Sequence, residues 1–181
     1  MKVTKTAIEG VFIIEPTVFE DERGYFFESW NKEKLKAAGI DYDFIQDNQS
    51  KSKYGTIRGI HFQKGEYSQA KLVRVLEGIV LDVAVDLRKN SPTFGQHVAV
   101  ELSADNKRQL MIPRGFGHGF SVLTPEAVFA YKCDNVYCKA AEGGLRYNDP
   151  ALGIDWKIAP GAEILSDKDK QNPFLGEIEC F

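Results

Sequence analysis

Histidine is the side chain best suited to proton transfer near neutral pH, and this sequence has three of them. His61 lies in the alternating run 58–62, which predicts a strand with Arg58 and His61 on opposite faces. His118 ends a P-x-G-x-x-H stretch that predicts a turn, whereas we interpret His97 as a surface or packing residue of an ordinary strand. A lone strand histidine is often structural, so spacing by itself leaves the role of His61 open.

A strand histidine followed later by a P-x-G-x-x-H turn resembles the two sequence motifs of the cupin barrel. In metal-dependent cupins the first motif supplies two histidines and an acidic residue, and the second motif supplies a further histidine. Here the first segment reads His61-Phe62-Gln63, so glutamine stands at the position of the second histidine ligand. Because glutamine is a poor ligand for iron, zinc or manganese, we predict cupin architecture without a metal site.

Other polar groups are candidates to surround His61 in such a barrel. They are the donors Arg58, Lys71 and His118, the phenols of Tyr131 and Tyr137, the run Gln46-Asp47-Asn48, and the cation, aromatic run and carboxylate of segment 23–29. Donors on separate strands suit a diphosphate, and tyrosine suits stacking on a base or proton transfer. Each residue taken singly is equally compatible with packing, since tyrosine is common in strands and arginine can lay its aliphatic part on a core.

Period-2 alternation dominates the middle of the chain and predicts the elements that must position these groups. It is clearest over 79–87, where it indicates a strand with one buried face. Similar runs predict strands over 58–62, 71–76, 97–102, 108–112 and 128–133, separated by turn residues. Short strands at such spacing predict an all-β protein, an antiparallel β-sandwich or jelly-roll barrel.

Helical patterns are scarce in this sequence. Asn31 is placed to cap a short helix over 32–38, which Gly39 would end. A second helical turn is expected to start at Ser166 and to stop before Pro173. Because no repeat, low-complexity tract or linker interrupts the pattern, we expect residues 1–181 to form a single domain with a polar pocket in the mouth of the barrel.

Composition excludes several classes of protein. The 181 residues are 43% hydrophobic and 27% charged and carry a net charge of −3, which gives no electrostatic case for nucleic acid or an anionic membrane as a partner. The apolar stretches are far shorter than a membrane span, and the N-terminus has no apolar core of a signal peptide. Three cysteines, Cys133, Cys138 and Cys180, form no C-x-x-C pair, so we expect reduced thiols in a cytoplasmic protein.

Taken together and in order, these segments resemble the dTDP-4-dehydrorhamnose 3,5-epimerase family nearly from end to end. The matching segments are Asp21–Ser29, Gln46–Asn48, Arg58–Gln63, Lys71–Arg74, Val83–Arg88, Ser91–Gly95, Ile112–Phe120 and Leu165–Asp169. The resemblance implies a cupin-like homodimer without metal or organic cofactor, which inverts C3 and C5 of dTDP-4-keto-6-deoxyglucose on the route to dTDP-L-rhamnose.

The resemblance also implies a role for individual residues. His61 is the base, Asp169 its carboxylate partner, Tyr131 the acid on the opposite face, and Lys71 the cation near the C4 oxygen. Arg58 and His118 line the sugar site, and Tyr137 stacks on the thymine. The remaining residues expected to contact the nucleotide or the substrate are Arg23, Glu28, Gln46, Asp47, Asn48, Glu142 and Lys168.

The implied chemistry agrees with these residue types. Both C3 and C5 are α to the C4 ketone, so either C–H bond ionises only if the enolate oxygen is stabilised, which a lysine in a partly dehydrated pocket can do. Asp169 would fix the tautomer of His61 and raise its basicity. Since Ser166-x-x-Asp169 also resembles a capping box, Asp169 has a second interpretation as a helix cap. No G-x-G-x-x-G loop follows a strand, in keeping with a reaction without a redox step.

The segment 23–29 also bears on quaternary structure. Consecutive residues of a strand face opposite sides, so Tyr25 and Phe27 need cover on one face and Phe26 on the other. A small barrel cannot easily bury all of them and Trp30, whereas a symmetric dimer would cover the second face and carry Arg23 toward a neighbour's pocket.

Three alternatives stay open at this point. The nearest is an epimerase acting at C3 or C5 only, which would use the same histidine, lysine and aspartate. A metal-dependent cupin is disfavoured by Gln63. A sugar-nucleotide binding module without turnover leaves the convergence of acid–base groups on one pocket unexplained.

Overall fold

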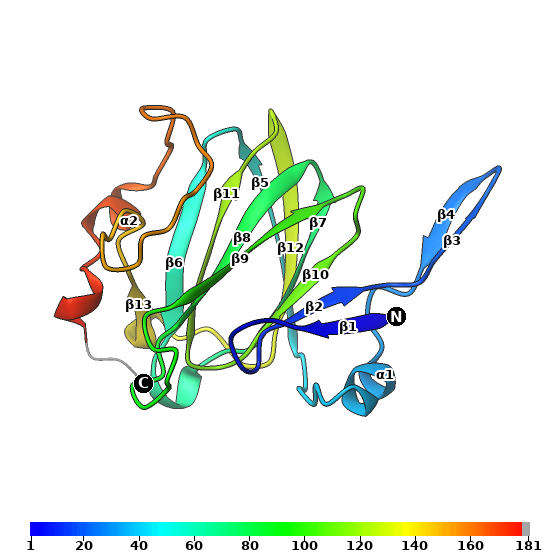
Figure 1. The fold of residues 1–181 in the computed structure, drawn as a ribbon, viewed down its shortest axis with the longest axis horizontal. Coiled ribbons are helices and arrows are strands. Elements are labelled where there is room, and N and C mark those ends of the chain that lie inside the picture. Colours follow the sequence, from blue (N-terminus) through cyan, green and yellow to red (C-terminus); the bar gives the residue numbers. More distant parts are fainter. Residues whose placement is uncertain (179–181) are drawn as a thin grey trace.

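Two facing sheets of antiparallel strands form the body of the computed structural model, which describes residues 1–178 (Figure 1). The first sheet has the order β1 (Lys2–Lys5), β2 (Phe12–Glu15), β10 (Gln109–Ile112), β7 (Lys71–Glu77), β12 (Glu126–Cys133) and β5 (Gln46–Lys53). The second has the order β13 (Glu142–Gly144), β6 (Ile57–Gln63), β11 (Phe116–Val122), β8 (Ile79–Asp86) and β9 (His97–Ser103). The all-β, cupin-like class expected from the sequence is confirmed.

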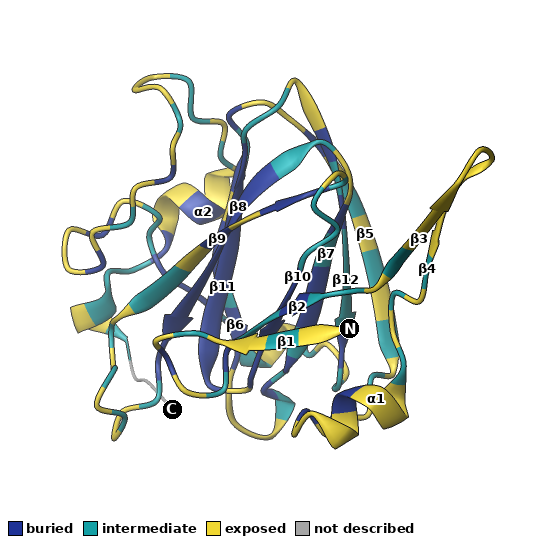
Figure 2. Ribbon diagram, turned by 45° about the vertical axis from the view of Figure 1, so that its right-hand side comes forward, coloured by how far each residue is buried: buried dark blue, intermediate teal, exposed yellow. Residues whose placement is uncertain are grey.

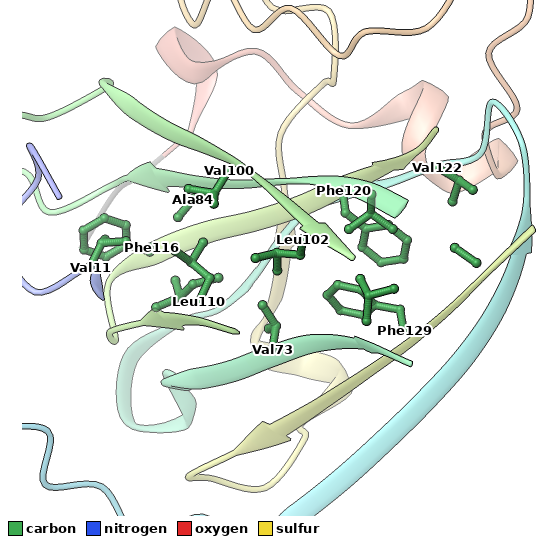
Figure 3. Packing of buried hydrophobic residues seen from close by; sticks show 14 of the residues in the cluster. Val11, Val73, Ala84, Val100, Leu102, Leu110, Phe116, Phe120, Val122 and Phe129 are labelled. Atoms are coloured by element: carbon green, nitrogen blue, oxygen red, sulfur yellow. The ribbon is translucent and has the colours of Figure 1, made fainter. Parts of the chain in front are cut away.

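The space between the two sheets holds the main hydrophobic core (Figure 3). Strands β7 to β12 contribute inward-facing residues to it, at alternate positions of the pleat. β11 contributes Phe116 and Phe120 and β12 contributes Phe129, whose ring stacks on that of Phe120 at a centroid distance of 4.2 Å. Phe120 and Phe129 also line the polar cavity described below, so this core borders that cavity.

Strand β8 is buried on both faces, whereas the sequence analysis expected one buried face. Its row Leu81, Val83 and Val85 packs under the C-terminal segment, against residues such as Leu145 and Trp156. The opposite row faces the space between the sheets, and its two carboxylates, Asp82 and Asp86, are fully buried. Two aspartates in the alternating pattern suggested a solvated face, but Asp86 is paired with Arg88 and Asp82 is hydrogen-bonded to His118 inside the protein.

Two further expectations about strands are corrected. Residues 116–119, expected to be part of a turn, begin β11, so His118 is a strand residue. Strand β5 was not expected, because Gln46–Lys53 contains no apolar residue. This edge strand faces a polar cavity on one side and solvent on the other, so its composition carries no alternation of apolar and polar residues.

The short helices form where the sequence places them. Helix α1 (Lys32–Ala37) begins after Asn31, whose side-chain oxygen accepts a hydrogen bond from the Lys34 backbone N–H at 3.0 Å. Helix α2 (Asp167–Gln171) begins after Ser166, and single 3₁₀ turns cover Gly65–Tyr67, Lys139–Ala141 and Leu175–Glu177. Figure 1 shows α2 lying beside β6, which brings the C-terminal segment to the polar end of the sandwich.

A two-stranded hairpin of β3 (Val18–Asp21) and β4 (Gly24–Phe27) projects from the body (Figures 1 and 2). Its aromatic side chains are largely exposed: Phe19 by 63%, Tyr25 by 60% and Phe26 by 69%. An apolar surface of this kind is unusual for a monomer.

No helix of the described residues is long and apolar enough to cross a membrane. Of the three cysteines expected as reduced thiols, Cys133 and Cys138 are free, and Cys180 lies outside the described residues.

Candidate active site

A cavity of about 940 Å³ lies at the polar end of the sandwich. Strands β5, β7 and β12 of the first sheet form one wall, and β6 and β11 of the second sheet form the other. Residues 164–166 and, in α2, Lys168 and Asp169 also line it. Of the residues proposed from the sequence, the cavity is lined by Asn48, Arg58, His61, Lys71, His118, Tyr131, Lys168 and Asp169.

His61 and Asp169 form a hydrogen-bonded pair that joins β6 to α2. The His61 Nε2 atom lies 2.5 Å from Asp169 Oδ1, and Asp169 is only 4% exposed. Burial raises the pKa of Asp169, but the hydrogen bond and charge of His61 outweigh it, so this pKa lies below its ordinary value. Because an ionised carboxylate only accepts, His61 donates Nε2–H to it and keeps the lone pair on Nδ1.

The helix cap and the carboxylate pair turn out to be compatible. Ser166 Oγ accepts a hydrogen bond from the Asp169 backbone N–H at 3.1 Å and caps α2. The side chain of Asp169 does not return to the cap but points to His61. The capping motif therefore orients the carboxylate that meets the imidazole.

Arg58 and His61 line the same cavity, which corrects the expectation that they face opposite sides. His118 pairs with His61 and Phe120 pairs with Arg58, so β6 has one residue more than β11 between these pairs. This β-bulge lets residues three apart share a face. It requires close approach of two backbones, since a Cβ atom on Gly59 would lie 2.5 Å from Cα of Gly119.

Lys71 and Tyr131 lie on the wall opposite His61. Strands β7 and β12 are neighbours, and the Lys71 Nζ atom lies 5.8 Å from the centroid of the Tyr131 ring. Burial lowers the pKa of Lys71, while burial and the nearby Cys133 raise the pKa of Tyr131. The phenol is thus protonated at neutral pH and can donate, so the cavity has an imidazole on one wall and a protonated phenol on the other.

His118 is buried and paired with a carboxylate that sequence reasoning missed. Its Nε2 atom lies 2.9 Å from Asp82 Oδ2. Burial lowers the pKa of His118, although Asp82 acts in the opposite direction. The position of Asp82, flanked by Val80 and Ala84 in one strand row, was the available signal, because a carboxylate in an apolar strand needs a partner.

Three of the expected residues meet beside the cavity, which one of them, Lys168, lines. Lys168 forms an ion pair with Glu142, and the Tyr137 hydroxyl donates to the same carboxylate at 3.2 Å. Hydrogen bonding to Lys168 lowers the pKa of Glu142. Tyr137 is 53% exposed, so its ring is open to a ligand.

Besides Tyr137 and Glu142, four expected residues do not line this cavity within one chain. Arg23 lies on the exposed hairpin and pairs with Asp21, and Glu28 pairs with Lys34 of α1. Asp47 pairs with Lys132. The fourth, Gln46, donates to Asn48 Oδ1 at 3.0 Å and so contacts a residue that does line the cavity.

Strand β5 contributes polar lining that the sequence analysis overlooked. Lys51, Ser52 and Lys53 line the cavity, and Ser52 Oγ accepts a hydrogen bond from Arg58 Nε at 3.0 Å. The signal was present as a run of eight polar residues in which serine and lysine alternate.

The donor set fits a metal ion poorly. Gln63, at the position of a cupin ligand, uses Oε1 to accept the Cys138 backbone N–H at 2.9 Å. The Nε2 atoms of His61 and His118 each bond to a carboxylate. Among residues 1–178, no three histidine, cysteine or acidic side chains gather as a metal site would require.

Comparison with known proteins gives a consistent result. The family model described as dTDP-4-dehydrorhamnose 3,5-epimerase matches residues 5–177. The curated enzyme of that name from Salmonella typhimurium is 54% identical over 178 residues, covering 98% of this chain and 97% of that protein.

Solved structures agree with the sequence comparison. A dTDP-4-dehydrorhamnose 3,5-epimerase from Elizabethkingia anophelis superposes with a TM-score of 0.94 at 56% identity, covering 98% of this chain and 97% of that one. A dTDP-6-deoxy-D-glucose-3,5-epimerase from Legionella pneumophila, crystallised with dTDP-4-keto-L-rhamnose, has a TM-score of 0.94 at 47% identity, with coverage of 98% and 94%.

Proposed function

Because the chain belongs to the dTDP-4-dehydrorhamnose 3,5-epimerase family, we propose that it inverts C3 and C5 of dTDP-4-keto-6-deoxyglucose to give dTDP-4-keto-L-rhamnose. The reaction would supply dTDP-L-rhamnose biosynthesis in the cytoplasm. The observation that carries the proposal is the placement of the His61–Asp169 pair and of Lys71 with Tyr131 on opposite walls of one cavity.

His61 removes the proton from carbon. Its Nδ1 lone pair is available because Nε2–H is engaged by Asp169, and the ionised carboxylate stabilises the imidazolium that forms. The bulge in β6 supports this role, since it turns the ring into the cavity beside Arg58.

Lys71 stabilises the enolate that each deprotonation leaves. As a cation in a site from which burial removes much of the water, it acts on the developing negative charge at the C4 oxygen more strongly than it would in solution. The same lysine serves both carbons, because C3 and C5 flank the one ketone.

Tyr131 returns a proton from the side opposite His61. Inversion requires that the new C–H bond form on the face from which the old one was not removed. A protonated phenol on the far wall meets that requirement, and burial keeps it protonated at neutral pH.

The cavity rim is suited to the nucleotide part of the substrate. Arg58, Lys51, Lys53 and Lys168 supply positive charge for a diphosphate, and the exposed ring of Tyr137 is available to stack on the thymine. His118 and Asn48 add polar contacts along the sugar.

The protein acts as a homodimer. The β3–β4 hairpin presents Phe19, Tyr25 and Phe26 to solvent, and a second copy packed against it would cover them. The same arrangement gives a function to Arg23, which lies at the tip of the hairpin far from its own cavity and would reach the neighbour's.

Incubation with dTDP-4-keto-6-deoxyglucose in D₂O tests the proposed reaction. Two carbon-bound deuterium atoms by mass spectrometry, with a product that a ketoreductase converts to dTDP-L-rhamnose, are expected. Incorporation of one deuterium atom would indicate the alternative, a single-centre epimerase. Incorporation of no deuterium would indicate a protein that binds the sugar nucleotide without turnover.

A further inference from the structure

Asp82 and Lys71 belong to inward-facing rows of the two opposing sheets, and His118, which bonds to Asp82, lines the same cavity as Lys71. Asp82 belongs to the inward row of β8, where its neighbours Val80 and Ala84 are core residues. Lys71 belongs to the inward row of β7, which continues with Val73. Lys71 lines the cavity and Asp82 does not, so the carboxylate lies behind the cavity wall.

Asp82 is an unusual carboxylate in this fold. Oδ2 bonds to His118 Nε2 at 2.9 Å, whereas Oδ1 is buried and has no hydrogen-bond partner among the described residues. The comparable residue of the same strand, Asp86, has its oxygens held by Arg88, Ser91 and Thr93. A half-satisfied buried carboxylate is costly to fold and needs a compensating reason.

We propose that Asp82, held in place by His118, is a positioning residue that supplies the counter-charge keeping Lys71 an ammonium ion in the cavity. The inference rests on the proposed function, in which Lys71 must be cationic to stabilise the enolate. It assigns Asp82 no contact with substrate: the residue acts through the charge state of Lys71.

The charge balance of the cluster supports this assignment. The polar groups around Lys71 are Tyr131 and Cys133 on β12, Asp82 on β8 and His118 on β11. Burial raises the pKa of Cys133 to about 11 and also raises that of Tyr131, so neither carries negative charge at neutral pH.

The two histidines do not alter that balance. Burial lowers the pKa of His118, which leaves it a neutral donor to Asp82. On the neighbouring strand, His61 has its own carboxylate in Asp169. Burial lowers the pKa of Lys71, whereas Cys133 and Asp82 act in the opposite direction, and Asp82 is the carboxylate of these two groups.

The test follows the Lys71 side chain directly by NMR with ¹³Cε-labelled lysine, its signal assigned by its loss in Lys71→Met. In the wild type, Lys71 is expected to be charged at pH 7. The Asp82→Asn variant keeps an oxygen that can accept the hydrogen bond from His118. In this variant the titration midpoint of Lys71 is expected to fall by about one pH unit or more. The alkaline limb of kcat/KM should move to lower pH by the same amount.

Asp86→Asn is the matched control, because it removes a buried carboxylate from the same row of β8 at a place where the charge pairs with Arg88. It should leave the Lys71 midpoint unchanged. A folded Asp82→Asn protein with the wild-type midpoint overturns the proposal, and so does a wild-type Lys71 that is neutral at pH 7. The Lys71 titration needs no substrate. Its result therefore tests this proposal separately from the D₂O experiment, which tests the epimerase reaction.

Discussion

His61 and His118 are direct partners in the register of β6 and β11, yet each ring bonds to a different buried carboxylate. His61 is 33% exposed at its side chain and joins Asp169 of α2, and His118 is almost fully buried and joins Asp82 of β8. The two imidazoles therefore differ in exposure and in the carboxylate that each contacts. The accessible one can exchange a proton with a ligand, and the buried one is held neutral.

Replacement of His61 by asparagine tests the accessible imidazole. Because the shape is roughly kept and the proton acceptor is lost, His61→Asn should abolish deuterium exchange at both carbons while dTDP affinity stays within a few-fold of wild type. Exchange is measured by mass spectrometry and binding by calorimetry. His97→Asn, on β9 outside the cavity lining, should exchange normally. Normal exchange by His61→Asn would remove His61 from the mechanism.

Asp169→Asn tests the carboxylate partner through stability. The folded-state pKa of Asp169 lies below its ordinary value, so its ionisation stabilises the native state above about pH 4 and this contribution is lost as pH falls through the folded pKa. The difference in urea midpoint between wild type and Asp169→Asn should therefore be larger at pH 7 than at pH 3. Equal differences at both pH values would show that the His61 contact gives Asp169 no preference for the charged form.

Features of the fold and of the site that depend on neighbouring residues in the sequence could be predicted from the sequence. Asn31 and Ser166 were expected to start helices because a cap depends on residues three positions away, and both do. The alternation over 79–87 likewise predicted a strand, because successive residues of a strand point to opposite faces.

What could not be predicted depends on contacts between distant segments. The bulge that turns Arg58 and His61 to one side arises from pairing with β11, where Gly119 lets the backbone of Gly59 approach. The burial of Asp82 depends on a second sheet and a C-terminal layer that no window of β8 reveals. Strand β5 carries no apolar pattern because its neighbours are a cavity and solvent.

Chelation tests the alternative of a metal-dependent cupin. Gln63 is engaged with the Cys138 backbone, and both cavity histidines bond to carboxylates. Extended treatment with EDTA followed by gel filtration should leave the epimerisation rate unchanged. A loss of rate that returns in proportion to an added divalent metal would contradict this expectation.

Phe26→Ser tests the role of the hairpin in dimerisation. Phe26 is 69% exposed on β4, so its replacement should not disturb the core but should weaken an interface that covers it. Light scattering at low micromolar concentration should show a dimer for the wild type and a larger monomer fraction for the variant. Phe94→Ser, at an exposed phenylalanine outside the hairpin, should remain dimeric. A wild-type protein that is monomeric and fully active would exclude the dimer.

Tyr131→Phe separates removal of the proton from its return. The phenol lies on β12 between the inward residues Phe129 and Cys133, on the wall opposite His61, so the variant keeps the ring and its packing and loses only the donor. His61 should still form the enolate, and reprotonation from the His61 side should wash deuterium into unreacted substrate. The inverted product should fall by about 10²-fold, the usual scale for one acid–base group. Both quantities come from one time course in D₂O, by mass spectrometry for exchange and by a coupled ketoreductase for inversion.

Tyr137→Phe is the matched control, because that hydroxyl donates to Glu142 beside the cavity. If Tyr131→Phe forms inverted product at the wild-type rate, Tyr131 is a packing residue, and slow inversion in the Tyr137 variant would then identify Tyr137 as the acid.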